Sequence, residues 1–401
     1  MRRRLFISVA LVLAVIGTTE PAHAAEPVDE VAVEFVMRND GVDRAEAIRR
    51  LAAQESYLAL ADRLTRELGT RSAGSWVDRR TGELVANVLD GAAADTARAA
   101  GARPQIVRYT ASDLEAHRAR LDRVAQEEGT GEVDSWYVDI QANRLVATVP
   151  TGADDAATRR FLDHVRAAGP MASIEPSAGE PVPLAANVYA GGTKTNSNGM
   201  LCSSGFAAKD AVGLQYMITA AHCMWQDVNM YIGNLHFGQR SYVNGSYDEA
   251  AVVNWYPAYW QQKASVWNYS GGFAQAVFGV WAAPVNTVAC KSGTTTGYTC
   301  GLIQQYNVPA KLNTYPGGQQ LWVFGLTKSS ICSKPGDSGG PIVVSNWAQG
   351  TLSSGLLYTS TGAKYNGVGI PYCGSQVGKP TAMYYQPIGA TLARAGLTIM
   401  V

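Results

Sequence analysis

Apolar and polar residues follow two different patterns along the chain. Residues 25–70 are rich in Ala, Arg, Glu and Leu, and their apolar positions recur with helical spacing. From residue 186 onward, the apolar residues occur in short runs that Gly, Asn, Ser and Pro interrupt. The first pattern predicts helices, and the second is typical of an all-β sandwich or barrel.

One alternating pattern occurs twice in the first half. Residues 75–88 read Ser-Trp-Val-Asp, a turn and Leu-Val-Ala-Asn-Val, and residues 135–149 nearly repeat this sequence. Each copy predicts a hairpin around a turn that contains Gly or Asn. A helix ending at Gly101 or Gly169 follows each hairpin, and a short strand follows each helix. We therefore expect two ββαβ units in tandem, whose last strands are residues 105–109 and 171–174.

The second half contains predicted strands and little else. The helical exception is residues 388–394, near the end of the chain. Between the halves, residues 171–185 are rich in Pro and lack periodicity beyond the short strand, which indicates a linker open to proteolysis. The clearest predicted strands are residues 216–219, 230–232, 250–253, 321–324 and 341–344.

Charge divides the chain at the same place. The whole chain is neutral, with 33 Lys and Arg against 33 Asp and Glu, and only 16% of its residues are charged. This composition argues against a disordered chain and against a polycation that coats nucleic acid. Residues 25–185 contain Arg but no Lys and carry −8, whereas residues 186–401 are rich in Lys and carry +6. The sequence therefore joins two unlike parts.

The first 24 residues have the features of a secretory signal peptide. Arg2, Arg3 and Arg4 precede a short apolar run, and an Ala-His-Ala sequence ends at Ala24. The apolar run is shorter than the ~20 residues that a membrane-spanning helix needs. We expect a secreted, extracellular protein that does not associate with a membrane.

All six cysteines lie between Cys202 and Cys373. An even number of cysteines in an exported domain indicates three disulfides. Cys-x-x-Cys pairs and clusters of Cys with His, which zinc sites use, do not occur, so we expect no metal.

Two segments of the second half point to nucleophilic catalysis, residues 218–223 around His222 and residues 334–341 around Ser338. A serine nucleophile needs an imidazole base and a carboxylate that fixes the tautomer of that base. The second half contains two histidines and five acids, of which Asp248 starts a predicted strand. Asp227 follows His222 too closely, and Asp337 is adjacent to the serine. We therefore expect a triad of His222, Asp248 and Ser338.

Two other hydrolase folds must be weighed against this triad. Gly336-x-Ser338-x-Gly340 also matches the nucleophile elbow of α/β-hydrolases, but that fold needs a histidine after the serine, and none follows Ser338. A subtilisin-like order could use Asp210, but it requires a parallel α/β sheet. The order His222, Asp248, Ser338 is the one found on antiparallel β-barrels, and it favours an acyl-transfer hydrolase.

At these residues the chain closely resembles the secreted bacterial chymotrypsin-like serine proteases, the streptogrisin and alpha-lytic protease family. The resemblance rests on Thr219–Cys223, on Gly336–Pro341 and on residues 290–301, which are similar to the alpha-lytic type. Residues 25–185 resemble the pro-region of the family, including both Trp-containing hairpins. Ala186-Asn187-Val188 looks like a mature N-terminus of this group.

The resemblance implies an all-β protease domain of two packed six-stranded β-barrels, with the triad in the cleft between them. Residues 1–24 would be the signal peptide, and residues 186–401 would be the protease. Residues 25–185 would be an α+β pro-region that assists the folding of the protease and inhibits it. The implied partners are polypeptide substrates and the chain's own pro-region. The resemblance also implies that the protein is a monomer that uses no cofactor and binds no nucleic acid. The implied disulfides are Cys202–Cys223, Cys290–Cys300 and Cys332–Cys373.

The resemblance also assigns further site residues. The oxyanion hole would consist of the N–H groups of Gly336 and Ser338, and Asp337 would form a buried pair with Lys291. Ser353 would border the triad carboxylate. The strand Ser353-Ser354-Gly355 would bind an extended substrate, and Ser333 and Leu352 would line a pocket for small to medium neutral apolar residues.

Two other functions are consistent with parts of this pattern. A chymotrypsin-like fold can persist as a catalytically silent binding module. The first half could also be an independent binding domain. The presence of all three triad residues together with the Gly336 loop favours an active secreted serine endopeptidase that its pro-region helps to fold.

Overall fold

A computed structural model describes residues 29–177, 182–183, 194–197, 199–312, 321–365, 367 and 369–401. The predicted signal peptide and the predicted processing site beside Ala186 lie outside these residues. None of the described helices is long and apolar enough to cross a membrane.

The helical pattern of residues 25–70 forms two helices, α1 (Glu30–Asp40) and α2 (Arg44–Leu68). Asp29 and Asp43 cap their N-termini, because each carboxylate accepts hydrogen bonds from backbone N–H groups of the first turn. Gly41 separates the helices in a left-handed conformation (φ 68°) that residues with a side chain seldom adopt.

The two repeats fold as the two expected ββαβ units. In each unit the first two strands are antiparallel and the last strand is parallel to the second. The last strand of the first unit is Arg103–Ile106 rather than 105–109, because these are the residues that pair with β2. A helix that connects the units, α4 (Ala111–Glu128), carries His117. The elements are β1 (Ser72–Asp78), β2 (Glu83–Val88), α3 (Gly91–Ala99) and β3 (Arg103–Ile106), then β4 (Ser135–Asp139), β5 (Arg144–Val149), α5 (Ala156–Arg166) and β6 (Ala172–Pro176).

Two eight-stranded sheets form the second half, and one short strand of the second sheet comes from residues 182–183 of the linker. All five predicted strands occur, and most are longer at one or both ends than predicted. In hydrogen-bonding order, the first sheet contains β26 (Thr398–Ile399), β10 (Ala207–Lys209), β11 (Gln215–Thr219), β14 (Glu249–Asn254), β13 (Leu235–Asn244), β12 (Asn229–Ile232), β8 (Lys194–Ser197) and β9 (Met200–Ser203).

The second sheet closes into a ring of six strands, because β22 pairs with both β21 and β25. This ring matches the six-stranded barrel that the resemblance implies, whereas the first sheet is larger by short strands at its ends. The ring contains β22 (Trp347–Gly355), β21 (Pro341–Val344), β18 (Val288–Gly293), β19 (Gly297–Leu312), β20 (Leu321–Ser329) and β25 (Met383–Pro387). Beside it lie β17 (Gly279–Val280) and β7 (Val182–Pro183), both paired with β22. The helix α6 (Ile388–Ala395) follows β25, as predicted.

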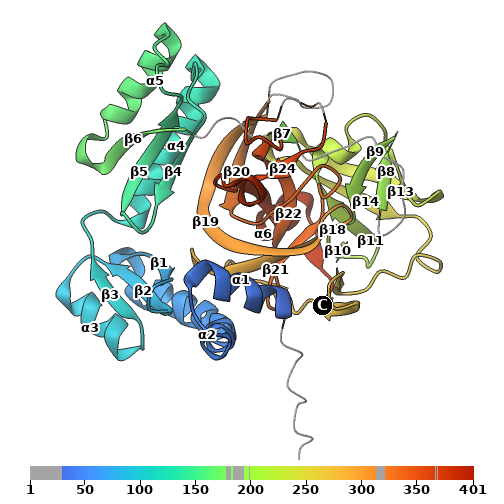
Figure 1. Cartoon of the computed structure of the whole chain (residues 1–401), viewed down its shortest axis with the longest axis horizontal. Helices are drawn as coiled ribbons and strands as arrows, with labels where there is room; N and C mark the ends of the chain where they lie inside the picture. Colours follow the sequence, from blue (N-terminus) through green and yellow to red (C-terminus); the bar gives the residue numbers. More distant parts are fainter. Residues whose placement is uncertain are drawn as a thin grey trace, which may run out of the picture.

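The first half packs against the second barrel. In Figure 1 the two repeats lie on the left side of the molecule and α1 and α2 lie at its lower side, and α1 and β4 contact the curved strand β19. Trp136 of β4 packs against Trp322 of β20, with ring centres 5.0 Å apart and ring planes tilted by 49°. The backbone N–H of Val77 donates to the carbonyl of Val285 at 2.8 Å, and Gln54 of α2 accepts from the N–H of Val288.

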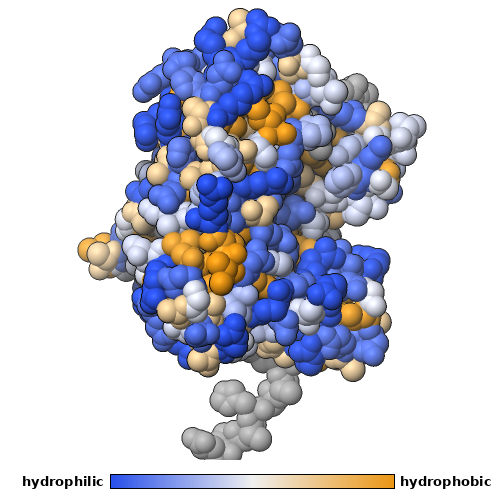
Figure 2. All heavy atoms as spheres, turned by 90° about the vertical axis from the view of Figure 1, so that its left-hand side faces the viewer, coloured by the Kyte–Doolittle hydropathy of each residue, from blue (hydrophilic) through white to orange (hydrophobic). Residues whose placement is uncertain are grey.

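The outward face of the first half is mainly hydrophilic, with smaller hydrophobic patches (Figure 2). Its Arg residues form short ion pairs there with acids on the same or the next turn of helix, such as Arg98 with Asp95 and Arg166 with Asp163. The high content of Arg and acids therefore provides a solvated surface, and the apolar residues of the repeats pack inward.

Candidate active site

His222 and Asp248 are brought together by neighbouring strands. His222 lies in a short 3-10 helix (Ala221–Met224) directly after β11, and Asp248 directly precedes β14. β11 and β14 are antiparallel, with Thr219 opposite Ala250, so the end of one strand meets the start of the other. The ring Nδ1 of His222 lies 2.8 Å and 3.0 Å from the two carboxylate oxygens of Asp248. The backbone N–H of His222 also donates to Asp248 at 2.9 Å.

Two serines of the second barrel complete this hydrogen-bonded group. The Ser353 hydroxyl donates to Oδ2 of Asp248 at 2.6 Å. The Ser338 hydroxyl lies 3.5 Å from the carbonyl oxygen of Ser353. All four residues are fully buried, so solvent does not compete for these hydrogen bonds. The group spans both barrels, because His222 and Asp248 belong to the first and the serines to the second.

The other His and acids considered in the sequence lie in different surroundings. The ring of His236 contacts the edges of Tyr231 and Trp255 and faces Asn229. Asp210 accepts hydrogen bonds from its own turn, and Asp227 accepts from the side chain and backbone of a residue two positions later. Among the described acids, Asp248 is therefore the one that holds His222.

A tight turn positions the backbone around Ser338. Gly336 has φ +100°, and a Cβ there would lie 2.2 Å from Oγ1 of Thr295, so both conformation and space favour glycine. The N–H of Ser203 donates to the Ser338 carbonyl at 2.8 Å, and the Ser203 hydroxyl donates to the Gly336 carbonyl at 2.9 Å. Ser203 was not predicted from the sequence, because no local pattern indicates a contact across more than 130 residues.

Asp337 and Lys291 form a fully buried pair beside this turn. Nζ of Lys291 lies 3.4 Å from Oδ2 of Asp337 and donates to the carbonyl of Gly297 at 2.8 Å. This separation is within the limit of about 6 Å that the expected pair requires. Burial lowers the pKa of Lys291, and the negative charge of Asp337 opposes that shift.

Asp337 also binds the loop before β19. Its carboxylate accepts from the backbone N–H groups of Thr295 and Thr296, from the Thr296 hydroxyl and from the N–H of Lys334, all at 2.7–3.0 Å. These bonds connect the turn that carries Ser338 to the Thr295–Thr296 loop. Neither threonine was assigned this role from the sequence.

The six cysteines form three disulfides, with the pairing that the resemblance implies. Cys202–Cys223 closes the segment that leads to His222, Cys290–Cys300 joins β18 to β19, and Cys332–Cys373 lies beside the turn of Ser338. Two groups of ligand-type side chains occur among the described residues, and each contains both cysteines of a disulfide. Because thiolates bind metals and disulfide sulfurs do not titrate, neither group fits a metal site.

The expected substrate strand is already paired with the chain itself. β7 (Val182–Pro183) runs antiparallel to β22, with Val182 opposite Gly355 and Pro183 opposite Ser354. The linker predicted for residues 171–185 therefore contains a second short strand, which its sequence did not indicate. Leu352 is buried in the core of the second barrel, and Ser333 is buried beside the turn.

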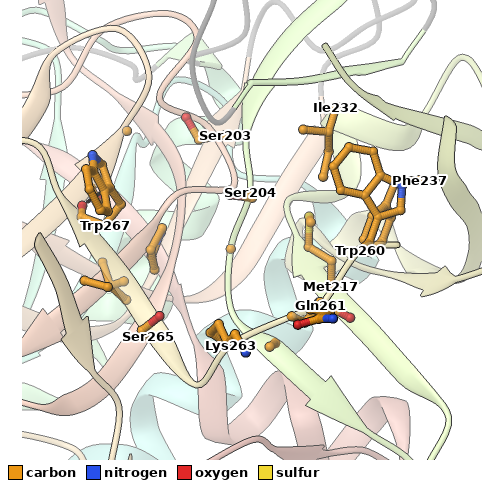
Figure 3. A pocket seen from close by; sticks show the side chains of 18 residues that line it. Ser203, Ser204, Met217, Ile232, Phe237, Trp260, Gln261, Lys263, Ser265 and Trp267 are labelled. Carbon is orange, nitrogen blue, oxygen red and sulfur yellow. Dashed lines mark hydrogen bonds between the residues drawn. The ribbon is translucent and has the colours of Figure 1, made fainter. Parts of the chain in front are cut away.

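A separate pocket of about 280 Å³ includes Ser203 in its lining (Figure 3). Ser203 and Ser204 line one side, and Trp260, Phe237 and Trp267 contribute aromatic walls. Pro341, which follows the turn of Ser338, also lines the pocket. None of the three expected triad residues lines it.

Comparisons with known proteins divide the chain in the same way. Residues 45–107 match the family described as alpha-lytic protease pro N-terminal, residues 109–169 match alpha-lytic protease prodomain, and residues 191–376 match trypsin. Streptogrisin-D of Streptomyces griseus is 30% identical over 85% of this chain and 79% of that protein. Serine protease 1 of Streptomyces fradiae is 31% identical over 76% of this chain and 81% of that protein.

Solved structures of bacterial proteases match about half of the chain. Nocardiopsis protease is 31% identical, with a TM-score of 0.42, and the match covers 53% of this chain and 98% of that chain. Cellulomonas bogoriensis chymotrypsin is 32% identical, with a TM-score of 0.40, and the match covers 52% of this chain and 97% of that chain.

Proposed function

Because the chain belongs to the streptogrisin and alpha-lytic protease family of serine endopeptidases, we propose that it cleaves peptide bonds with a triad of His222, Asp248 and Ser338. One observation carries this proposal. The imidazole of His222, the carboxylate of Asp248 and the hydroxyl of Ser353 form one buried hydrogen-bonded group, which reaches the Ser338 hydroxyl through the Ser353 carbonyl.

Each residue has a defined role in the proposed reaction. His222 accepts the proton of Ser338 as the serine oxygen attacks the scissile carbonyl, and it then protonates the leaving amine. Asp248 keeps Nδ1 of His222 protonated and stabilises the imidazolium. The N–H groups of Gly336 and Ser338 bind the oxyanion. Water then attacks the acyl-enzyme, and His222 accepts its proton and returns it to Ser338.

The proposed specificity is for small to medium neutral apolar residues before the cleaved bond. The segments 330–334 and 352–355, which would form the pocket, contain no acid that could bind Lys or Arg. Ser333 is small, and Leu352 supplies apolar volume. A panel of peptides that differ at this one position tests the assignment, and a preference for Arg or Glu would overturn it.

We assign residues 25–185 to a pro-region that also inhibits the protease. β7 occupies the backbone edge of Ser354 and Gly355 where an extended substrate would pair. The precursor would release this edge by cutting itself shortly after Pro183, at the position expected next to Ala186. The three disulfides are consistent with secretion, and we propose that the mature protease acts outside the cell as a monomer.

Labelling with a peptidyl organophosphonate tests the triad directly. The wild-type protein should be labelled once, on Ser338, and Ser338→Ala should be neither labelled nor processed into two chains. N-terminal sequencing of the processed protein locates the cut. Labelling of Ser338→Ala, or stable wild-type protein that neither reacts nor cleaves peptides, would exclude the proposed function.

A further inference from the structure

One arginine contacts both neighbours of Asp248. Arg394 lies near the end of α6, and its Nε and Nη2 donate to the two carboxylate oxygens of Glu249, each at 2.6 Å. The central carbon of the same guanidinium lies 3.9 Å from the ring centre of Tyr247. Arg394 therefore binds the residue before and the residue after the acid of the proposed triad.

Glu249 is fully buried, and further donors fix its orientation. The Tyr242 hydroxyl donates to Oε1 at 2.6 Å, and the Thr391 hydroxyl donates to Oε2 at 2.8 Å. Each carboxylate oxygen thus accepts from one guanidinium N–H and one hydroxyl. A buried carboxylate with four donors on two elements has one favourable position, and this position fixes the first residue of β14.

Gln386 of β25 extends the same network to the backbone. In the amide orientation that satisfies its neighbours, Nε2 donates to the carbonyl of Tyr247 at 3.0 Å and Oε1 accepts from Nη2 of Arg394 at 2.8 Å. That carbonyl belongs to the peptide bond that leads into Asp248. The peptide is therefore held from the second barrel, although Asp248 belongs to the first.

The backbone of Asp248 needs such support. Asp248 has φ 51° and ψ 48°, a left-handed conformation that is unfavourable for residues other than Gly. From that conformation its carboxylate accepts from the N–H of His222 and from the Ser353 hydroxyl, and it contacts Nδ1 of His222. Relaxation of the backbone toward a commoner conformation would rotate the carboxylate away from these partners.

We propose that Arg394 is a positioning residue for proteolysis, acting through Glu249, Tyr247 and Gln386 to hold the Asp248 carboxylate against His222. The inference rests on the proposed function, because it assumes that Asp248 is the triad acid. Arg394 does not touch the substrate or the reacting atoms. It supplies the planar fork that binds Glu249 with two N–H groups while stacking on Tyr247, which a lysine cannot do.

Arg394→Lys, processed from the full-length precursor, tests the role of the fork. Lysine keeps a positive charge beside the buried Glu249 but loses the second hydrogen bond and the stacking. Active sites are counted with the organophosphonate, so that misfolded protein does not enter the rate. We expect kcat per active site for peptide hydrolysis to fall by about tenfold, with KM within about twofold of wild type. Ala393→Gln, an exposed change on the same helical turn, is the matched control and should keep both values.

A spectroscopic measurement separates positioning from stability. We expect the proton between Nδ1 of His222 and Asp248 to give a downfield resonance in the proton NMR spectrum of the mature enzyme. This resonance should shift or broaden in Arg394→Lys and should stay unchanged in Ala393→Gln. A role limited to fastening α6 would lower the midpoint of urea unfolding, with no effect on the resonance or on kcat per active site.

The double variant Glu249→Gln, Arg394→Gln removes both charges together and provides a second test if Arg394→Lys does not fold. It avoids an unpaired buried charge, which single removal would leave. We expect the same loss of kcat and the same change in the resonance. If a folded variant, either Arg394→Lys or the double variant, keeps the wild-type kcat and the wild-type resonance, the positioning role is overturned and the proposed function is not. Absence of phosphonate labelling and cleavage in the wild type would overturn the proposed function itself and this inference with it.

Discussion

Replacing Asp337 by Asn should destabilise the protease, because Lys291 would remain buried without its counter-charge. The neutral amide of the variant cannot balance the charge of the ammonium, which lies 3.4 Å from Oδ2 of the present carboxylate and is fully buried. Breaking a buried ion pair in this way typically costs about 3–5 kcal/mol. That cost corresponds to a change in the folding equilibrium on the order of a hundredfold to several thousandfold.

The loss should depend on pH in a direction that the buried lysine sets. Burial already lowers the pKa of Lys291 below 10.5, and Asp337 opposes this shift, so the pKa falls further in Asp337→Asn. A folded state that binds its proton more weakly than the unfolded state becomes more stable as pH rises. The deficit of the variant should therefore be largest at low pH. It should shrink as pH rises through the interval between the two folded-state pKa values of Lys291.

Urea unfolding of the precursor measures this loss of stability and its pH dependence. A Ser338→Ala background prevents self-digestion during the measurement. The unfolding free energies of Asp337→Asn and its parent are compared at several pH values between about 6 and 10. Lys291→Met combined with Asp337→Asn is the control, because removing both charges should recover part of the loss. A deficit below about 1 kcal/mol, or one that stays constant over this pH range, would refute the reasoning.

Three further substitutions test single contacts of the site. Ser353→Ala removes a hydrogen bond to the Asp248 carboxylate that is worth about 1.5–3 kcal/mol. The kcat per phosphonate-titrated site should therefore fall by about 10- to 100-fold. An unchanged kcat would contradict this role of Ser353. Gly336→Ala forces a side chain into a backbone with φ +100°, and peptide hydrolysis should fall on the order of a hundredfold, whereas activity within threefold of wild type would exclude the proposed oxyanion turn. Replacing Cys332 and Cys373 by Ser opens a loop of 41 residues and should lower the unfolding free energy by about 4 kcal/mol in urea titrations; a loss below about 1 kcal/mol would count against the loop-entropy account.

The predictable parts of the structure are those that local sequence determines. The short β-rich run of residues 341–344 predicted β21 with both of its ends, and the repeated Trp-containing motif predicted both hairpins. The site was expected from motifs for the same reason, since His222 follows a strand directly and Ser338 lies in a turn that requires Gly336.

Contacts between distant residues did not follow from these patterns. The pair Glu249 and Arg394 is 145 residues apart, and neither residue lies in a motif that identifies the other. β7 was missed because two residues in a Pro-rich segment have no periodicity, and their strand conformation depends on the free edge of β22. Both features depend on how the barrels and the first half pack, which local propensity does not encode.

The hydrogen bond from Ser353 to Asp248 joins the two barrels at the centre of the proposed site. A molecule whose barrels separate even slightly would therefore lose its ability to cut before it lost most of its structure. Peptide hydrolysis in a sample would then come from the molecules whose two barrels are correctly assembled.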